Sequence, residues 1–173
     1  SKWLFLDSLG GHYDLFEALV NYAVKNNIKI ACNPGGKELQ RGLSKLAPLL
    51  KSIDIFLVNK EEAKSLFGEQ NPRDFMPKAI ISISDGPRGV MVFDKEKIYT
   101  AGIPDSPVVE RTGAGDAFGS GFVSEFIRSG DIVKAIQFGT ANASSVVTQF
   151  GAKAGILKQG DWGPWGLIEV KKS

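Results

Sequence analysis

The chain has 173 residues, of which 43% are hydrophobic and 23% charged, and its formal net charge is +2. This composition is typical of a globular protein that is long enough to bury a substantial core. Lys and Arg are scattered rather than gathered in a basic stripe, which argues against nucleic acid as a partner. Apolar runs are too short for a membrane span and no signal peptide is recognisable, so we expect no membrane association and a cytoplasmic location.

The first part of the chain alternates short apolar runs with helical patterns. Strands are expected at residues 3–6, 28–32 and 53–58, and helices at residues 14–25, 39–50 and 61–67. The second of these helices contains Pro48, where we expect a break or a restart. This alternation predicts a parallel sheet covered by helices. Because the chain starts at Ser1 within an apolar strand and without Met, we interpret it as a processed chain or a fragment.

The remainder adds a hairpin and two helices. Residues 69–77 are expected to form a surface loop, residues 79–84 a strand, and residues 90–93 and 98–101 a β-hairpin. Helical spacing follows over residues 113–129 and 132–147, and residues 162–170 are expected to form an irregular tail. The second helix is rich in Gly, Ala, Ser and Thr, which allow close packing against a neighbour or a ligand. Without repeats or a dividing linker, residues 1–173 are expected to form a single α/β domain.

Two side chains with possible chemistry are assigned ordinary structural roles. Cys32 is the only cysteine and His12 the only histidine, so neither an internal disulfide nor a Cys/His metal cluster can form. Cys32 lies in an apolar run and is expected in the core. His12 lies in a polar loop and is expected to be solvated.

The stretch from Glu110 to Phe118 carries the strongest chemical signal. Three small residues, Gly113, Ala114 and Gly115, precede Asp116 and are expected to form the first turn of a helix. The unpaired N–H groups and partial positive charge of a helix N-terminus bind anions, and small side chains allow close approach. Beside a bound phosphate, the carboxylate of Asp116 is placed to act as a general base.

These residues and three further motifs resemble the PfkB (ribokinase-like) family of sugar and nucleoside kinases. Gly113-Ala114-Gly115-Asp116, after Thr112, is similar to its C-terminal signature, and residues 59–62 to its Asn-x-x-Glu element. Residues 84–89 are similar to its Thr-x-Gly-x-x-Gly nucleotide loop, and residues 150–152 match a fourth landmark. The resemblance implies a three-layer α/β/α fold with a mostly parallel central sheet, lacking the N-terminal part that supplies the lid and much of the sugar pocket.

The resemblance also implies a role for each matching residue. Asp116 would take the proton from the acceptor hydroxyl as it attacks the γ-phosphate of ATP, while the N–H groups of Gly113, Ala114 and Gly115 hold the developing charge. Asn59 and Glu62 would order the waters around Mg²⁺. The nucleotide would lie along Ser84, Gly86 and Gly89, with Thr140 and Asn142 on the adenine side. A monovalent cation such as K⁺ binds near the anion site in many members, and a homodimer is common in the complete enzymes.

The sequence departs from the family pattern at two of these places. Glu110-Arg111-Thr112 replaces the usual Asp-Thr-Thr, and Arg111 brings a positive charge near the expected K⁺ site. Thr140 stands where many members carry Asn. The expected reaction is phosphoryl transfer from ATP to an alcohol group of a small sugar or nucleoside.

Each motif also fits a purely structural role. Asn59 and Glu62 form the pattern of a helix-capping box, residues 84–89 contain ordinary turn chemistry, and Asp116 could serve only the helix dipole. The second functional hypothesis is a nucleotide-binding fragment or scaffold without turnover of its own. The hypothesis of a dinucleotide-dependent oxidoreductase is weaker, because the glycines lack the spacing of the dinucleotide-binding fingerprint and no acidic residue follows that could bind the ribose. The absence of a Gly-Lys-Ser/Thr element excludes a Walker-type NTPase.

Overall fold

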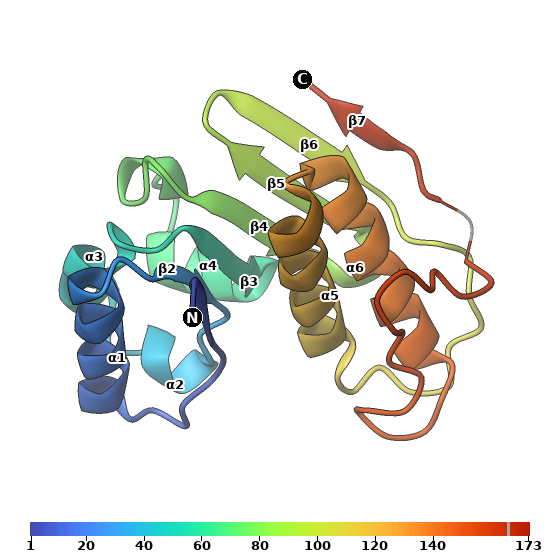
Figure 1. Cartoon of the computed structure of the whole chain (residues 1–173), viewed down its shortest axis with the longest axis horizontal. Coiled ribbons are helices and arrows are strands. Elements are labelled where there is room, and N and C mark those ends of the chain that lie inside the picture. The colour runs from blue at the N-terminus through green and yellow to red at the C-terminus, as the bar shows by residue number, and fades with distance from the viewer. Residues whose placement is uncertain (166) are drawn as a thin grey trace. The chain divides into compact units, whose positions relative to one another are not determined.

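The computed structural model describes residues 1–165 and 167–173 and shows an α/β structure (Figure 1). Among the described residues, seven strands follow one another in sheet order from β1 to β7. The chain divides into two compact units. Unit 1 comprises residues 1–84 and 92–98, and unit 2 comprises residues 85–91 and 99–173. The prediction of a single domain over the whole chain stays a prediction.

Unit 1 is built from parallel strands and the helices that connect them. Its complete strands are β1 (Trp3–Leu6), β2 (Lys29–Cys32), β3 (Ile55–Asn59) and β4 (Ile80–Ser84), and each pairs with the next in parallel. The connecting helices are α1 (Tyr13–Lys25), α2 (Gly36–Leu39), α3 (Leu43–Leu50) and α4 (Lys60–Phe67), with a short 3₁₀ helix at Pro72–Asp74. The predicted alternation of strand and helix is confirmed.

The core of unit 1 lies between these strands and helices. Phe16 on α1 and Phe56 on β3 are buried, and Phe67 at the end of α4 packs edge-on against Phe56 with ring centroids 6.3 Å apart. Cys32 is fully buried in the same cluster, as expected, and burial raises the pKa of its thiol. A protonated, buried thiol is a small apolar core residue rather than a nucleophile.

The helical stripe over residues 39–50 differs from the prediction. The sequence predicts a break at Pro48, but α2 ends at Leu39 and α3 begins at Leu43, with Pro48 inside α3. Gly42 is the N-cap of α3 and adopts φ +80°, a positive value that glycine adopts without a Cβ clash. Glycine rather than proline therefore sets the boundary.

Unit 2 contains two long helices that lie side by side, α5 (Ala114–Ser129) and α6 (Ile132–Val147) (Figure 1). A Cβ atom at Gly139 on α6 would lie 3.0 Å from the ring of Phe118 on α5. A Cβ at Gly121 on α5 would lie 3.2 Å from the Cα of Gly139. The small residues of α6 thus allow close packing against a neighbouring helix, which confirms one of the two expectations for this face.

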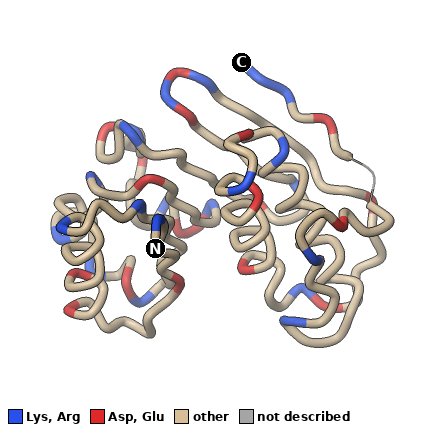
Figure 2. The backbone as a smooth tube through the Cα atoms, viewed as in Figure 1, with Lys and Arg blue, Asp and Glu red and all other residues tan. Residues whose placement is uncertain are grey.

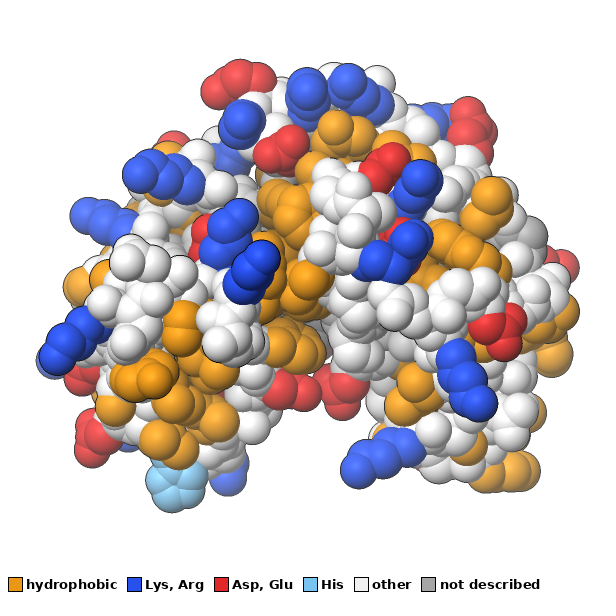
Figure 3. Space-filling model, in the orientation of Figure 1, with side chains coloured by type: hydrophobic (Ala, Val, Ile, Leu, Met, Phe, Trp, Pro, Cys, Tyr) orange, Lys and Arg blue, Asp and Glu red, His pale blue; other side chains and the backbone are white. Residues whose placement is uncertain are grey.

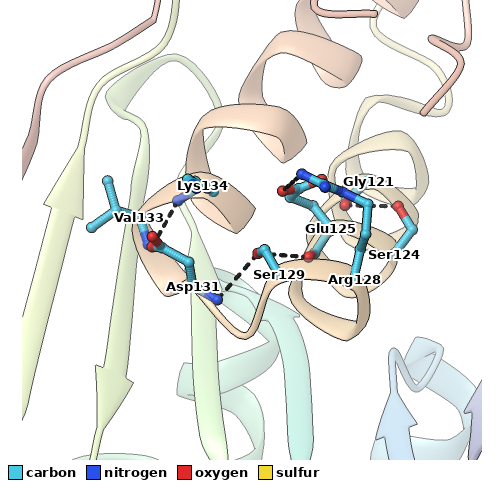
Figure 4. Close-up of polar contacts among 8 residues, drawn as sticks. All are labelled: Gly121, Ser124, Glu125, Arg128, Ser129, Asp131, Val133 and Lys134. Carbon is cyan, nitrogen blue, oxygen red and sulfur yellow. Dashed lines mark hydrogen bonds and ion pairs between the residues drawn. The ribbon is translucent and has the colours of Figure 1, made fainter. Parts of the chain in front are cut away.

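The turn between α5 and α6 follows from local chemistry (Figure 4). Gly130 ends α5 in a left-handed conformation, with φ +67°, and its N–H donates to the Phe126 carbonyl oxygen at 2.8 Å. Asp131 then caps α6, because its carboxylate accepts from the N–H of Val133 at 2.9 Å. Nearby, Glu125 is buried, and its carboxylate accepts hydrogen bonds from Arg128 Nη2 at 2.6 Å and from Arg128 Nε at 2.9 Å.

Short strands complete the structure. The hairpin strands are β5 (Val90–Asp94) and β6 (Lys97–Ala101), close to their predicted positions. The tail adds β7 (Val170–Lys172), which pairs antiparallel with Tyr99–Ala101 of β6 and is absent from the predicted elements. Part of the expected irregular tail, residue 166, lies outside the described residues.

Charges of both signs are interspersed along the backbone of each unit and over the face drawn in space-filling form (Figures 2 and 3). Over the described residues, no helix is both long and apolar enough to cross a membrane.

Candidate active site

The start of α5 positions the residues with the strongest chemical signal. The helix begins at Ala114, one residue later than predicted, and Gly113 is its N-cap with φ +82°. The N–H of Ala117 donates to the carbonyl oxygen of Gly113 at 2.9 Å and closes the first turn. Ala114, Gly115 and Asp116 are therefore the first three helical residues, whose N–H groups lie at the positive end of the helix dipole.

Gly113 is required at this place for two reasons. Its positive φ is strained for any residue with a side chain. A Cβ atom here would also lie 2.5 Å from the carbonyl oxygen of Ala152 and 2.8 Å from its Cα. The chain segment after α6 thus packs directly on the start of α5, and the 150–152 landmark lies beside the Gly113–Asp116 motif within unit 2.

Glu110 forms a hydrogen bond to the segment that follows α6. Its Oε2 accepts a hydrogen bond of 2.8 Å from the backbone N–H of Gly151. This bond, followed by one from the Thr112 side chain, lowers the pKa of Glu110 from its usual value. In the sequence, Glu110 is only a departure from the family pattern. Its role as a tether is missed there because Gly151 lies 41 residues away along the chain.

Asp116 and Gly115 are accessible from outside the protein. Both residues are exposed, and a Cβ atom placed on Gly115 would meet nothing within 4 Å. An anion can therefore approach the backbone of the first turn of α5 closely. Asp116 carries the sign of charge that the helix dipole favours, and its expected role as a general base stays a prediction.

At the end of β3, Asn59 and Glu62 form a complete capping box. Asn59 Oδ1 accepts from the N–H of Glu62 at 2.8 Å, and Glu62 Oε2 accepts from the N–H of Asn59 at 2.9 Å. The capping role that the sequence pattern allows is therefore present. Since one carboxylate oxygen of Glu62 is engaged in the cap, the other is the candidate for a cation or its waters.

The surroundings of Glu62 fit Mg²⁺ bound through water rather than in a protein cage. Among the described residues, no group of three or more His, Cys, Asp or Glu side chains could hold a metal ion. Mg²⁺ keeps several waters and is commonly bound by one or two carboxylates together with substrate phosphates. A single half-buried carboxylate such as Glu62 suits that mode of binding.

Ser84 lies beside Asn59 within unit 1. The two residues are register partners at the carboxyl ends of the parallel strands β4 and β3. Ligands of open α/β sheets commonly bind outside the carboxyl ends of the strands. The structure thus brings together three of the predicted residues of this unit, namely Asn59, Glu62 and Ser84.

Gly86 and Gly89 belong to a tight turn in unit 2. Both adopt a positive φ, +52° and +96°, and a Cβ on Gly89 would collide with the carbonyl group of Ala101. Within the turn, Arg88 forms an ion pair with Asp85 at 2.6 Å. The glycines are therefore explained by the turn itself, and their expected nucleotide contacts stay a prediction.

Thr140 and Asn142 use their polar groups inside the protein. The Thr140 hydroxyl donates to its own helix, with the carbonyl oxygens of Ile136 and Gln137 both 2.9 Å away. Asn142 is bonded to Ala117 on α5 and to the backbone N–H of Leu157. Both residues are buried. Their expected place on the adenine side stays a prediction.

Comparison with known proteins identifies the family to which the chain is similar. The model of the pfkB family of carbohydrate kinases matches residues 13–159. The ribokinase of Haemophilus influenzae is 32% identical over 151 residues, which cover 81% of this chain and 48% of that protein.

Solved structures show the same fold. The nucleoside kinase of Methanocaldococcus jannaschii, described as an archaeal member of the ribokinase family, superposes with a TM-score of 0.76 at 21% identity, covering 90% of this chain and 52% of that one. A structure described as a ribokinase II of E. coli, in complex with ATP and Mg²⁺, gives 0.77 at 19% identity, covering 90% and 55%. The chain spans about half the length of the relatives it matches. It belongs to the pfkB family of carbohydrate kinases.

Proposed function

We propose that the protein containing this chain transfers the γ-phosphate of ATP to an alcohol group of a small sugar or nucleoside. The observation that carries the proposal is the start of α5, where an exposed Asp116 follows an accessible helix N-terminus. Family membership supports the reaction class, and relatives named ribokinase and nucleoside kinase support the acceptor class.

In the proposed reaction, the acceptor hydroxyl oxygen attacks the γ-phosphorus and the bond to the β,γ-bridging oxygen breaks, which leaves ADP. Asp116 takes the hydroxyl proton as the new bond forms. The N–H groups at the start of α5, those of Gly113, Ala114 and Gly115, stabilise the negative charge that spreads over the transferring phosphoryl group. This requires no covalent intermediate with the protein.

The remaining predicted residues are assigned to the nucleotide and its cation. Glu62 would bind Mg²⁺ through water, with Asn59 holding the Glu62 backbone in place. Ser84, Gly86 and Gly89 would lie along the nucleotide, and Thr140 would shape its adenine side. A monovalent cation, such as K⁺, is assigned to the region next to the anion site. A crystal structure with ATP and Mg²⁺ among the structural neighbours supports the choice of cofactor.

Replacing Asp116 with Asn tests the proposal. In the product of the complete reading frame, we expect Asp116→Asn to lower kcat by about 10²-fold to 10⁴-fold, because general-base catalysis typically contributes that much. ATP affinity, measured by isothermal titration calorimetry, should change little. Turnover that survives the substitution would show that Asp116 is not the base.

A second candidate is a nucleotide-binding chain without turnover of its own. The chain spans only about half the length of its relatives, which supports this alternative for the 173 residues taken alone. Titration with ATP and Mg²⁺, together with a turnover assay over a panel of sugars and nucleosides, separates the two. Binding without turnover that is restored by the complete reading frame would favour the second candidate for this chain.

A further inference from the structure

Asn142 is a buried side chain whose amide bridges two separate parts of unit 2. It lies on α6 with 2% of its surface exposed. Its Nδ2 donates to the carbonyl oxygen of Ala117 at 2.7 Å, and its Oδ1 accepts from the N–H of Leu157 at 2.8 Å. These partners fix the orientation of the amide, since a flipped side chain would face a donor with a donor and an acceptor with an acceptor.

The packing of α5 against α6 leaves room for this bridge. A Cβ atom on Gly121 of α5 would lie 3.2 Å from Asn142 Cβ and 3.3 Å from its Nδ2. A Cβ at position 121 would therefore make a tight contact with the Asn142 side chain. The bridge depends on the close approach of the two helices, and it ends on Ala117, the residue that follows Asp116.

The other end of the bridge holds the loop formed by residues 150–157. At its beginning, the Gly151 N–H is bound by Glu110 and Ala152 packs on Gly113. In its middle, Gly155 adopts φ +79°, and a Cβ there would lie 2.6 Å from the Ser145 carbonyl oxygen on α6. At the end of the loop, the Leu157 N–H donates to Asn142. The 150–157 loop is thus attached to the start of α5 from both of its ends.

We infer that Asn142 is a positioning residue for phosphoryl transfer, acting through Ala117 and Leu157. It holds the first turn of α5 against the 150–157 loop and so keeps the N–H groups beside Asp116 in the geometry that the transition state needs. The inference rests on the proposed kinase function. In this inference Asn142 acts on the site indirectly, since its buried amide is hydrogen-bonded to Ala117 and to Leu157.

The test compares Asn142→Ala with Glu125→Gln in the product of the complete reading frame. Glu125 is an equally buried polar residue on α5, but its partner Arg128 lies near the opposite end of the helix (Figure 4). For Asn142→Ala we expect kcat per folded molecule to fall about tenfold to hundredfold, with the KM for ATP changed by less than about threefold. Glu125→Gln should lower stability without lowering kcat per folded molecule.

Amide hydrogen exchange on the same variants supplies a readout that does not need activity. Asn142→Ala should accelerate exchange at Leu157 and at Ala117, whose N–H closes the first turn of α5, and Glu125→Gln should not. Unchanged exchange at these positions, or a kcat equal to that of the wild type, would overturn the inference. A wild-type protein that turns over no acceptor would instead overturn the proposed function, and the inference with it.

Discussion

Two carboxylates near the start of α5 have different surroundings. Glu110 accepts hydrogen bonds from the Gly151 N–H and the Thr112 side chain, which favour its ionised form and lower its pKa. Such a group is a weak base. Asp116 is exposed in the first turn of the helix. Glu110 therefore has a structural role, and the residue proposed as the base is Asp116.

The hydrogen bonds of Glu110 predict a pH-dependent contribution to stability. Because its pKa is lowered in the folded protein, its contribution is fully present above the unfolded value, about 4.3, and is lost as the pH falls through the folded value. We therefore expect the wild type to exceed Glu110→Gln in free energy of unfolding at pH 7, by a margin that shrinks below about pH 5.

Urea denaturation at pH 7, 5, 4 and 3 measures this margin, with Glu69→Gln on an exposed loop as the control for the loss of one charge. The substitution at position 110 keeps an oxygen that can accept from Gly151, so that the charge is the main change. A margin that is the same at pH 7 and pH 3 would contradict the assigned role of Glu110.

At the scale of elements, the spacing of apolar residues predicts the bounds of a helix well where one face of that helix is buried. The bounds of α6 match the prediction, because its apolar and small residues repeat at helical spacing. The predicted boundary between α2 and α3 is wrong, since a stripe of leucines does not reveal the positive φ of Gly42. The strand β7 is missed because two lysines in three residues do not resemble a strand, although an edge strand tolerates them.

The candidate site is predictable only in part, because some of its contacts join residues that are distant in the sequence. Motif spacing locates Asn59, Glu62 and Asp116, because each lies within one local element. The contacts of the 150–157 loop with Glu110 and Asn142 join residues far apart in the chain or on different elements, and no local pattern encodes them. Sequence thus singles out candidate side chains, Asn142 among them, but not the contacts between distant segments that support them.

The capping box of α4 allows its structural and functional roles to be separated. In Glu62→Gln the new side chain can still accept from the Asn59 N–H, since Gln also serves at this position of a capping box. We expect the free energy of unfolding to change by less than about 0.5 kcal/mol. The carboxylate proposed for Mg²⁺ is lost, so the Mg²⁺ concentration needed for half-maximal turnover should rise several-fold.

Glu61→Gln is the matched control, because Glu61 is a neighbouring acid in the first turn of the same helix and is exposed. It should alter neither the midpoint of urea denaturation nor the Mg²⁺ requirement. If Glu62→Gln and Glu61→Gln behave alike in Mg²⁺ titrations of turnover, Glu62 acts only as a cap.

At the scale of the whole molecule, the chain is a family member that spans about half the length of its relatives. Both compact units carry residues of the family motifs, with Asn59, Glu62 and Ser84 in unit 1 and Gly113 to Asp116 in unit 2. Each group is supported by contacts within its own unit, namely the capping box and strand register in one, and the loop contacts of Gly113 in the other. Nucleotide binding is therefore expected to require less of the complete protein than catalysis does.

This division predicts that ATP with Mg²⁺ stabilises the 173-residue chain itself. A ligand that binds only the folded state at 100 times its Kd raises the free energy of unfolding by about 2.7 kcal/mol. We expect an increase of this order, measured by urea denaturation with and without ATP and Mg²⁺, and slower amide exchange at the accessible Gly115. Asp116→Asn should keep the stabilisation, because its substitution removes the base and leaves the backbone N–H groups. If ATP neither stabilises the chain nor slows exchange at Gly115, the start of α5 is not a phosphate site in this chain.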